Sequence, residues 1–536
     1  MKLKNILFFL LIIFLILFGI SLIQINIIEY KMFSKGHDWR ELTYIFKEIN
    51  STGFSEYFKV HIRFICYLLQ PVYELIDKTG IFIFYFQCIA NIIPCIFLFL
   101  IARKLLKDDV IAFLLALFYC LYNIFFQYLH FDGYVDYFLL IIPILYFVIE
   151  KKIKIALILL IPYLFIREDS IFISFIIPLY LFYKQKITTA FKFAIFIIFF
   201  GLLIYSISKN AFSANSIKQI PGSVLVYQSD NEKIEKNSLV GYNYSHLGSN
   251  ETEILSNFYR FPITRVKELL SKKNSDFLTF FIGDILYVPL INIYWFVLNL
   301  IPLSYVLISS ENSMLRIGLH KASYLPHLYL SLLMSFSILL SFAKKISSGK
   351  YNFVKPIKAL IIVYLILIIF YQIPIIYKNL NLKVFQDYNK KIKLFNDLKI
   401  NRPEIIKIKK LVYKETDDSK AIVVTERMHY FFFDTINSYS YGYDTLEFSE
   451  NDVYVVFFNN RRFPVSHFIL DYSLDRGIGA GRYKDGLLLK LIQNYKYEIF
   501  YIKYPVIALR KKKDGQNILK NANQIAEFKK LVETNN

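Results

Sequence analysis

Long runs of Ile, Leu, Phe and Tyr recur along this chain, and they constrain its fold more than any other feature. A helix needs about 20 apolar residues to cross the hydrocarbon core of a bilayer. The chain is 56% hydrophobic, above the roughly 45–50% of soluble domains. The sequence therefore predicts a mainly α, polytopic membrane protein. We expect about eleven spans, near residues 5–28, 81–101, 110–129, 134–149, 155–166, 170–183, 190–208, 277–292, 294–309, 319–342 and 357–376.

The basic residues between spans predict the orientation of the helices. Lys and Arg cluster before the first span and in alternate short loops, at residues 2–4, 103–107, 151–154, 184–186 and 344–358. Such loops stay in the cytoplasm. The first span is too long for a cleaved signal, and no small-residue cleavage site follows it, so we expect an anchor with a cytoplasmic N-terminus.

The opposite, external side then receives two large loops, residues 29–80 and 209–276, and the tail. We expect a transmembrane domain over residues 1–377 and an external soluble domain over residues 378–536. In the tail, Ala421–Thr425, Val453–Phe458 and Ile499–Tyr504 are short β-branched or aromatic segments that indicate strands. Helices are expected at Glu404–Tyr413 and Gly486–Gln493, which makes the tail a small α/β domain. The glycine-rich stretch Gly477–Gly481 follows no clear strand, so a surface loop is favoured over a phosphate-binding loop.

The composition argues against some functions. The net charge is +21, but many of the cations flank apolar spans, where they orient helices rather than bind nucleic acid. The four cysteines have neither zinc-site nor disulfide-framework spacing and are expected to be small apolar filler. No P-loop, dinucleotide-binding fingerprint, nucleophile elbow or metalloprotease signature occurs.

Carboxylates on the expected external side are the first candidates for chemistry. Asp38 follows the first span, where it could act as a general base or hold a metal, or be a solvated partner of Arg40. Asp132 and Asp136 are four residues apart and would share a helix face. Asp136 opens an apolar span, where a carboxylate is a functional candidate, while Asp132 could instead cap the helix.

Basic and aromatic residues on the same side could bind a substrate. Arg167, Glu168 and Asp169 interrupt two apolar stretches, either as a structural ion pair or as a site for an anionic head group. His61 precedes Arg63, and the two could hold a phosphate or be ordinary polar residues of the loop. Tyr244 and His246 are candidates in the second loop, although their chemistry alone favours an ordinary aromatic-rich loop. His320 would share a helical face with His327; a zinc site there is disfavoured because i,i+4 is the usual spacing.

These segments together resemble a family of membrane proteins known as domain of unknown function 2079. The likeness is carried in order by Asp38, His61 with Tyr67–Tyr73, Phe131-Asp132 with Asp136, Arg167–Asp169, Tyr244–Gly248, and His320 with Pro326. It covers roughly residues 5–345. The chain departs from the family pattern at Tyr134-Val135, Arg63-Phe64 and Thr43, which leaves a redirected or degenerate activity open.

The family is similar to the GT-C superfamily of membrane glycosyltransferases. The resemblance implies a GT-C-like bundle in a bacterial inner membrane, a polyprenyl-phosphate-sugar donor, and an acidic first-loop residue, Asp38, as base. No cofactor is certain, and a divalent metal is optional. A transporter or flippase for a lipid-linked or polar solute, and a non-catalytic envelope scaffold, remain alternatives, because intramembrane carboxylates also mark proton relays.

Overall fold

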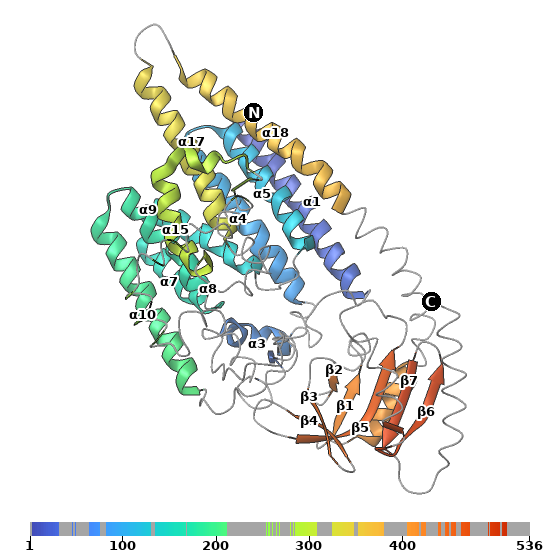
Figure 1. Cartoon of the computed structure of the whole chain (residues 1–536). Helices are drawn as coiled ribbons and strands as arrows, with labels where there is room; N and C mark the ends of the chain where they lie inside the picture. The colour runs from blue at the N-terminus through green and yellow to red at the C-terminus, as the bar shows by residue number, and fades with distance from the viewer. Residues whose placement is uncertain are drawn as a thin grey trace. The chain divides into compact units, whose positions relative to one another are not determined.

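The computed structural model separates the chain into two compact units, which are described individually. The first contains the helices from α1 to α18, and the second contains a β-sheet and the helix beside it (Figure 1). The structure describes residues 3–31, 45–46, 49, 64–75, 82–129, 135–167, 169–211, 253, 256–257, 260, 264, 267, 279, 282–283, 285–307, 324–347, 352–379, 405–416, 420–424, 438–440, 445–449, 452–456, 462–471, 491–492, 494–503 and 506–511.

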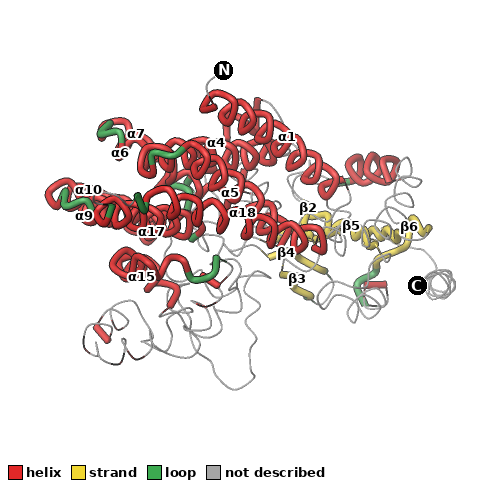
Figure 2. The backbone as a smooth tube through the Cα atoms, turned by 90° about the horizontal axis from the view of Figure 1, so that it is seen from above, coloured by secondary structure: helices red, strands yellow, loops and turns green. Residues whose placement is uncertain are grey.

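Apolar helices make up the first unit (Figure 2). In chain order they are α1 (Leu3–Lys31), α3 (Ile65–Leu75), α4 (Phe82–Leu106), α5 (Asp109–Leu129), the 3-10 helix η2 (Val135–Leu140), α6 (Ile141–Ile149), α7 (Ile153–Leu164), α8 (Asp169–Ser174), α9 (Ile176–Tyr183), α10 (Ile187–Ala211), the 3-10 helix η4 (Val288–Asn292), α15 (Ile293–Leu307), α17 (Leu325–Ile346) and α18 (Val354–Asn379). Among the described residues, four helical stretches are long and apolar enough to cross a membrane: Tyr85–Leu106, Ile187–Ile204, Leu325–Ile346 and Val354–Pro374.

Nearly every expected span coincides with helical structure. Over residues 277–292 the helical structure is interrupted: residues 279 and 282–283 are helical, a turn follows at residues 285–287, and η4 comes after it. Leu286 and Tyr287 have left-handed backbone angles, with φ of 50° and 57°, and Pro289 supplies no amide hydrogen. These three residues separate the helical residues 279 and 282–283 from η4 and α15, so the described part of 277–309 is helical on both sides of a turn.

α17 forms the centre of the first unit, and α10 and α18 have lipid-facing character. Within their apolar windows, 72% of α17 is buried, against 22% of α10 and 28% of α18. α17 contacts α4, α15, α18 and η4 (Figure 1). The exposed residues of α10 and α18 are mainly large and apolar, as a bilayer requires.

Ion pairs define one end of this unit. Lys104, in the last turn of α4, pairs with Glu150 after α6 (2.5 Å), and Lys358 of α18 pairs with Asp108 before α5 (2.6 Å). Three of the basic loops expected on one side of the membrane therefore gather at one end of the helices. We call it the Lys-rich end.

The second unit is a seven-stranded mixed sheet. Its strands are β1 (Ala421–Val424), β2 (Ser438–Ser440), β3 (Thr445–Phe448), β4 (Val453–Val456), β5 (Arg462–Asp471), β6 (Tyr497–Lys503) and β7 (Val506–Lys511). The order β2-β1-β5-β4-β3 continues through β7, which pairs with β5 and β6. β1 runs parallel to β2 and β5, and the other described pairings are antiparallel.

A helix over residues 405–415 covers this sheet. Its apolar residues Ile405, Ile408 and Val412 share a core with Ile422 and Ile469 of the strands. The mixed α/β character expected for the tail is confirmed, with β1, β4 and β6 at three expected strands. Residues 491–492 of the expected helix 486–493 are helical, and Gly477–Gly481 lies outside the described residues.

Candidate functional site

The structure describes two of the ten expected site residues with their side chains. Arg167 and Asp169 lie between α7 and α8, and Asp136 is described only as backbone in η2. The other seven lie outside the described residues: Asp38, His61, Asp132, Glu168, Tyr244, His246 and His320.

Arg167 and Asp169 form an ion pair that is largely withdrawn from solvent. Arg167 Nε lies 3.2 Å from Asp169 Oδ2, and the side chains are 14% and 10% exposed. Ser170 fixes the turn that carries them: its Oγ bonds to the Leu164 carbonyl at 3.1 Å and the Arg167 carbonyl at 2.6 Å. Burying an ion pair removes two charges from water, which costs free energy. Holding these two charges here therefore lowers the stability that the fold would otherwise have.

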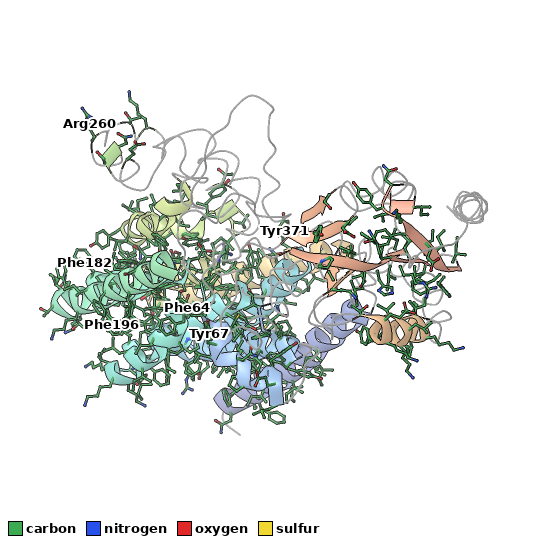
Figure 3. The ribbon with its side chains drawn as sticks, turned by 90° about the horizontal axis from the view of Figure 1, so that it is seen from below. Phe64, Tyr67, Phe182, Phe196, Arg260 and Tyr371 are labelled. Carbon is green, nitrogen blue, oxygen red and sulfur yellow. The ribbon has the colours of Figure 1, made fainter. Side chains whose placement is uncertain are left out.

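α3 packs directly beside this turn. The Ile65 amide donates to the Phe165 carbonyl at 2.9 Å, and the rings of Phe64 and Phe165 meet edge to face at 6.1 Å. Figure 3 shows Phe64 and Tyr67 among the side chains of the helices. The hydrogen bond joins the expected first external loop to the Arg167 turn, two residues before Arg167.

The Arg167 turn lies at the end of the bundle opposite the Lys-rich end. α7 begins just after Glu150, at the Lys-rich end, and runs away from it to the turn. η2 also begins away from that end, because α6 continues it towards Glu150, and the Tyr163 hydroxyl bonds to its Phe138 carbonyl at 3.1 Å. The Arg167 turn, the first turn of α3 and the start of η2 are therefore at one end.

Two buried polar clusters between helices were missed by the sequence reasoning. In the first, Asn91 of α4 and Asn123 of α5 bond to each other at 3.4 Å, and the hydroxyl of Tyr329 on α17 donates to Asn123. In the second, His327 of α17 bonds to Asn299 of α15 at 2.8 Å. Asn and His inside apolar spans were the available signal, since such groups are expensive in a membrane.

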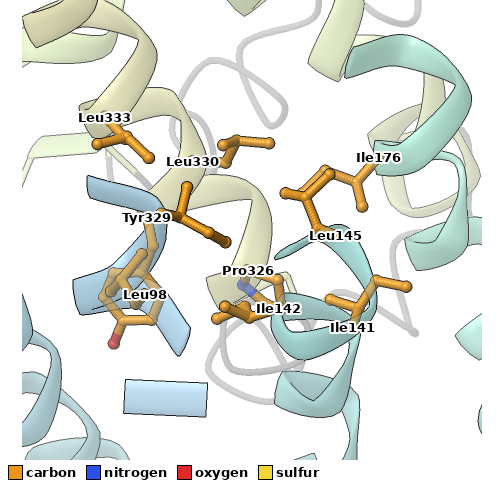
Figure 4. Close-up of a pocket in the computed structure, with 10 residues that line it drawn as sticks. Leu98, Ile141, Ile142, Leu145, Ile176, Pro326, Tyr329, Leu330 and Leu333 are labelled. Atoms are coloured by element: carbon orange, nitrogen blue, oxygen red, sulfur yellow. The ribbon is translucent and has the colours of Figure 1, made fainter. Parts of the chain in front are cut away.

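The buried cysteines and a cavity in the first unit both lie in apolar surroundings. All four cysteines are buried and unbridged, and the Sγ atoms of Cys95 and Cys120 lie 3.3 Å apart. A small cavity lies among α4, α6, α9 and α17 (Figure 4). It is lined by Leu98, Ile101, Ile141, Ile142, Leu145, Ile176, Pro326, Tyr329, Leu330 and Leu333. The Tyr329 hydroxyl is already bonded to Asn123, so the cavity suits apolar groups.

No group of three or more His, Cys, Asp and Glu side chains with the geometry of a metal site occurs within the part of the chain that the structure describes. Oxygen ligands from several carboxylates are what Mg²⁺ or Ca²⁺ would require. The optional metal of the sequence analysis thus concerns carboxylates that are outside the described residues, with Asp169 as the described exception.

The family model described as predicted membrane protein, domain of unknown function 2079 (DUF2079), matches residues 43–409. The chain belongs to this family. The DUF2079 match contains every described helix from α3 to α18 and reaches the helix over residues 405–415, while α1 and the whole sheet lie outside it. The resemblance stated from motifs in the sequence is therefore confirmed at the level of the DUF2079 family and its membrane character. No curated protein and no solved structure matches the chain significantly.

Proposed function

We propose that this DUF2079 protein is a membrane glycosyltransferase that moves a sugar from a polyprenyl-phosphate donor to an acceptor at the external membrane face. The observation that carries the proposal is the Arg167–Asp169 pair, which is largely buried, sits at the end opposite the Lys-rich end, and adjoins α3. A guanidinium carries five N–H groups, so an arginine can bind a carboxylate and a phosphate at the same time.

The orientation follows from the distribution of positive charge. Lysine-rich loops are retained on the cytoplasmic side of a membrane. The Lys-rich end would then be cytoplasmic, and the Arg167 turn and the C-terminal unit would be external, in an inner membrane. A lipid-linked donor would enter from the bilayer, so the enzyme would need no nucleotide-binding fold.

In the proposed reaction an acceptor hydroxyl attacks the anomeric carbon of the donor sugar. Asp38 takes the hydroxyl proton as the new C–O bond forms, and the bond to the phosphate oxygen breaks with its electron pair leaving on the polyprenyl phosphate. Arg167 and His61 stabilise the departing phosphate by charge-assisted hydrogen bonds. General-base assistance of this kind contributes about 10²–10⁴ in rate.

The remaining candidates are proposed as substrate-binding residues. Their carboxylates would orient sugar hydroxyls or hold an optional divalent cation, Tyr244 and His246 would close over the site, and His320 would add a further contact. The carboxylates in this set are Asp132, Asp136, Glu168 and Asp169.

The test is sugar release from a radiolabelled polyprenyl-phosphate sugar by the purified protein in lipid nanodiscs. Asp38→Asn should lower the rate by about 100-fold or more, and Arg167→Gln should lower it too. Arg103→Gln is the matched control, because Arg103 forms a helix-end ion pair with Asp109 (2.9 Å) at the Lys-rich end. Equal rates for the wild type and Asp38→Asn would refute the proposal.

A second candidate, transport of a lipid-linked or polar solute, has its own support. Helices interrupted within the bilayer often border transporter binding sites, and two interruptions adjoin α17 or its neighbours: η4 before α15, and the break between α8 and α9. Solute movement into proteoliposomes without cleavage of a sugar–phosphate bond would favour transport over transfer.

A further inference from the structure

One face of α17 is polar although the helix is at the centre of an apolar bundle. His327, Ser331 and Ser335 follow one another at intervals of four residues and therefore share this face. Their exposed fractions are 0%, 4% and 0%. We call these three residues the α17 polar face. It is directed towards α15 and η4, since Asn299 bonds to Ser331 at 2.9 Å and Ser335 Oγ to the Pro289 carbonyl at 3.5 Å.

The hydrogen bonds on this face have a definite direction. Ser331 Oγ donates to the His327 carbonyl at 2.7 Å, and Asn299 Nδ2 donates to Ser331 Oγ at 2.9 Å. Asn299 therefore presents its Oδ1 to His327 Nδ1, 2.8 Å away. An amide oxygen only accepts, so Nδ1 carries the imidazole proton and Nε2 of the neutral ring offers a lone pair.

Two buried polar atoms of this region have no hydrogen-bond partner of ordinary geometry among the described residues: His327 Nε2 and Trp295 Nε1. Trp295 is four residues before Asn299, so it is on the same side of α15. A further polar neighbour of the His327 ring is the backbone of Ile173 in α8, where a carbonyl is the group that can accept a hydrogen bond. α8 stops one residue later, and the Phe175 amide bonds to the Phe172 carbonyl three residues back.

A buried polar atom without a partner loses the hydrogen bond that it makes to water in the unfolded chain, and an ordered water molecule can restore that bond for a modest loss of its own entropy. A lone pair on Nε2 facing a carbonyl calls for a ligand that donates twice, as water does. A bound cation or an imidazolium is disfavoured, because α15 has no charged residue, and Asp169 of α8 is paired with Arg167, which precedes that helix.

We propose that the α17 polar face binds internal water inside the transmembrane unit. One molecule donates to His327 Nε2 and to the Ile173 carbonyl, and another accepts from Trp295 Nε1. These water molecules then hydrate the α17 polar face inside the helix bundle, beside the break between α8 and α9. This site is independent of glycosyl transfer, since no proposed site residue belongs to it.

Radiolytic footprinting of the full-length protein in nanodiscs and H₂¹⁸O tests the proposal, because bound water generates hydroxyl radicals at the side chains it touches. Trp295 and Tyr324, whose ring lies 5.6 Å from that of His327, are the reporters. Tyr119 and Tyr122 of α5 are the controls, since all four residues are 0–1% exposed. After correction for intrinsic reactivity, the reporters should gain ¹⁸O at least tenfold faster than the controls.

Two variants separate bound water from general looseness. His327→Leu removes the acceptor and should reduce labelling of Tyr324 to the control rate. Tyr329→Phe changes another buried residue of α17, which bonds to Asn123 instead, and should leave Tyr324 labelling unchanged. Reporters that label as slowly as Tyr119 and Tyr122, or Tyr324 labelling that persists in His327→Leu, would overturn the proposal.

Discussion

The two ends of the transmembrane unit hold their charges in different ways. At the Lys-rich end, Arg103 and Asp109 are 32% and 33% exposed, and Lys104 and Glu150 are 43% and 29% exposed. At the other end, Arg167 and Asp169 are only 14% and 10% exposed. Exposed pairs contribute about 0–1 kcal/mol, whereas loss of one partner from a buried pair costs about 3–5 kcal/mol. This difference supports the proposal that the Lys-rich end orients the helices in the membrane and that the Arg167 end is a binding site.

The largest expected effect comes from breaking the buried pair. Asp169→Ala should lower the free energy of unfolding by about 3–5 kcal/mol, because Arg167 keeps a withdrawn charge without its carboxylate. The measurement is denaturant unfolding in mixed micelles. The double variant Arg167→Met/Asp169→Leu should recover most of the loss; a double variant as unstable as Asp169→Ala would show that packing, not charge, is responsible.

The second unit extends the comparison to a buried titratable group beside a β-sheet. Burial lowers the pKa of His467 to about 4, although Glu415 favours its protonation; the charges of Arg510 and Lys420 oppose it. The unfolded chain takes up this proton near pH 6.5, so stability is full above that pH and falls as the pH decreases from 6.5 to 4. The loss should reach about 3 kcal/mol at pH 4.

Pulse proteolysis of the second unit in the intact protein, at several pH values, measures this dependence. His467→Phe should flatten the curve between pH 6.5 and 4, since the titrating group is gone. A wild-type curve already flat in that range would contradict the role of His467.

A smaller effect is expected at the start of α5. Asp108 Oδ1 accepts from the Val110 and Ile111 amides, both at 3.1 Å, and its Oδ2 pairs with Lys358. Asp108→Ala should cost about 1–2 kcal/mol, chiefly from the lost cap. Asp108→Ser retains a capping oxygen and should recover about half, as thermal unfolding in nanodiscs can establish.

The smallest effect is expected for the exposed pair itself. Arg103→Gln should change stability by less than about 1 kcal/mol, and high salt should reduce even that difference. A change as large as that of Asp169→Ala would remove the distinction between the two ends.

The sequence predicted the helices well and the polar interior poorly. Hydropathy predicted α4, α17 and α18, because a segment that spans lipid must be apolar and must satisfy its backbone hydrogen bonds internally. Hydropathy gave no sign of the turn at Leu286 and Tyr287, since left-handed backbone angles do not change the hydropathy of a segment. The sequence analysis did not predict β5, although it is the longest described strand. Its Pro464 and its charged residues interrupt the run of β-branched and aromatic residues that indicates a strand.

The candidate site was predictable only in part, and for a physical reason. The interruption of two apolar stretches by Arg167 and Asp169 was visible, because charges are rare at that depth. The hydrogen bond between His327 and Asn299 joins residues of two helices that are 28 positions apart in the chain, so no local sequence pattern predicts it. Which carboxylates share the end with Arg167 beyond Asp169 remains a prediction of the topology.

A cryo-EM map of the protein in nanodiscs with a bound polyprenyl-phosphate sugar tests the central claim most directly. The account predicts the lipid phosphate against the Arg167 guanidinium, with the Asp38 carboxylate within reach of the acceptor side of the sugar. A phosphate bound at the Lys-rich end, or Asp38 turned into open solvent far from Arg167, would contradict it.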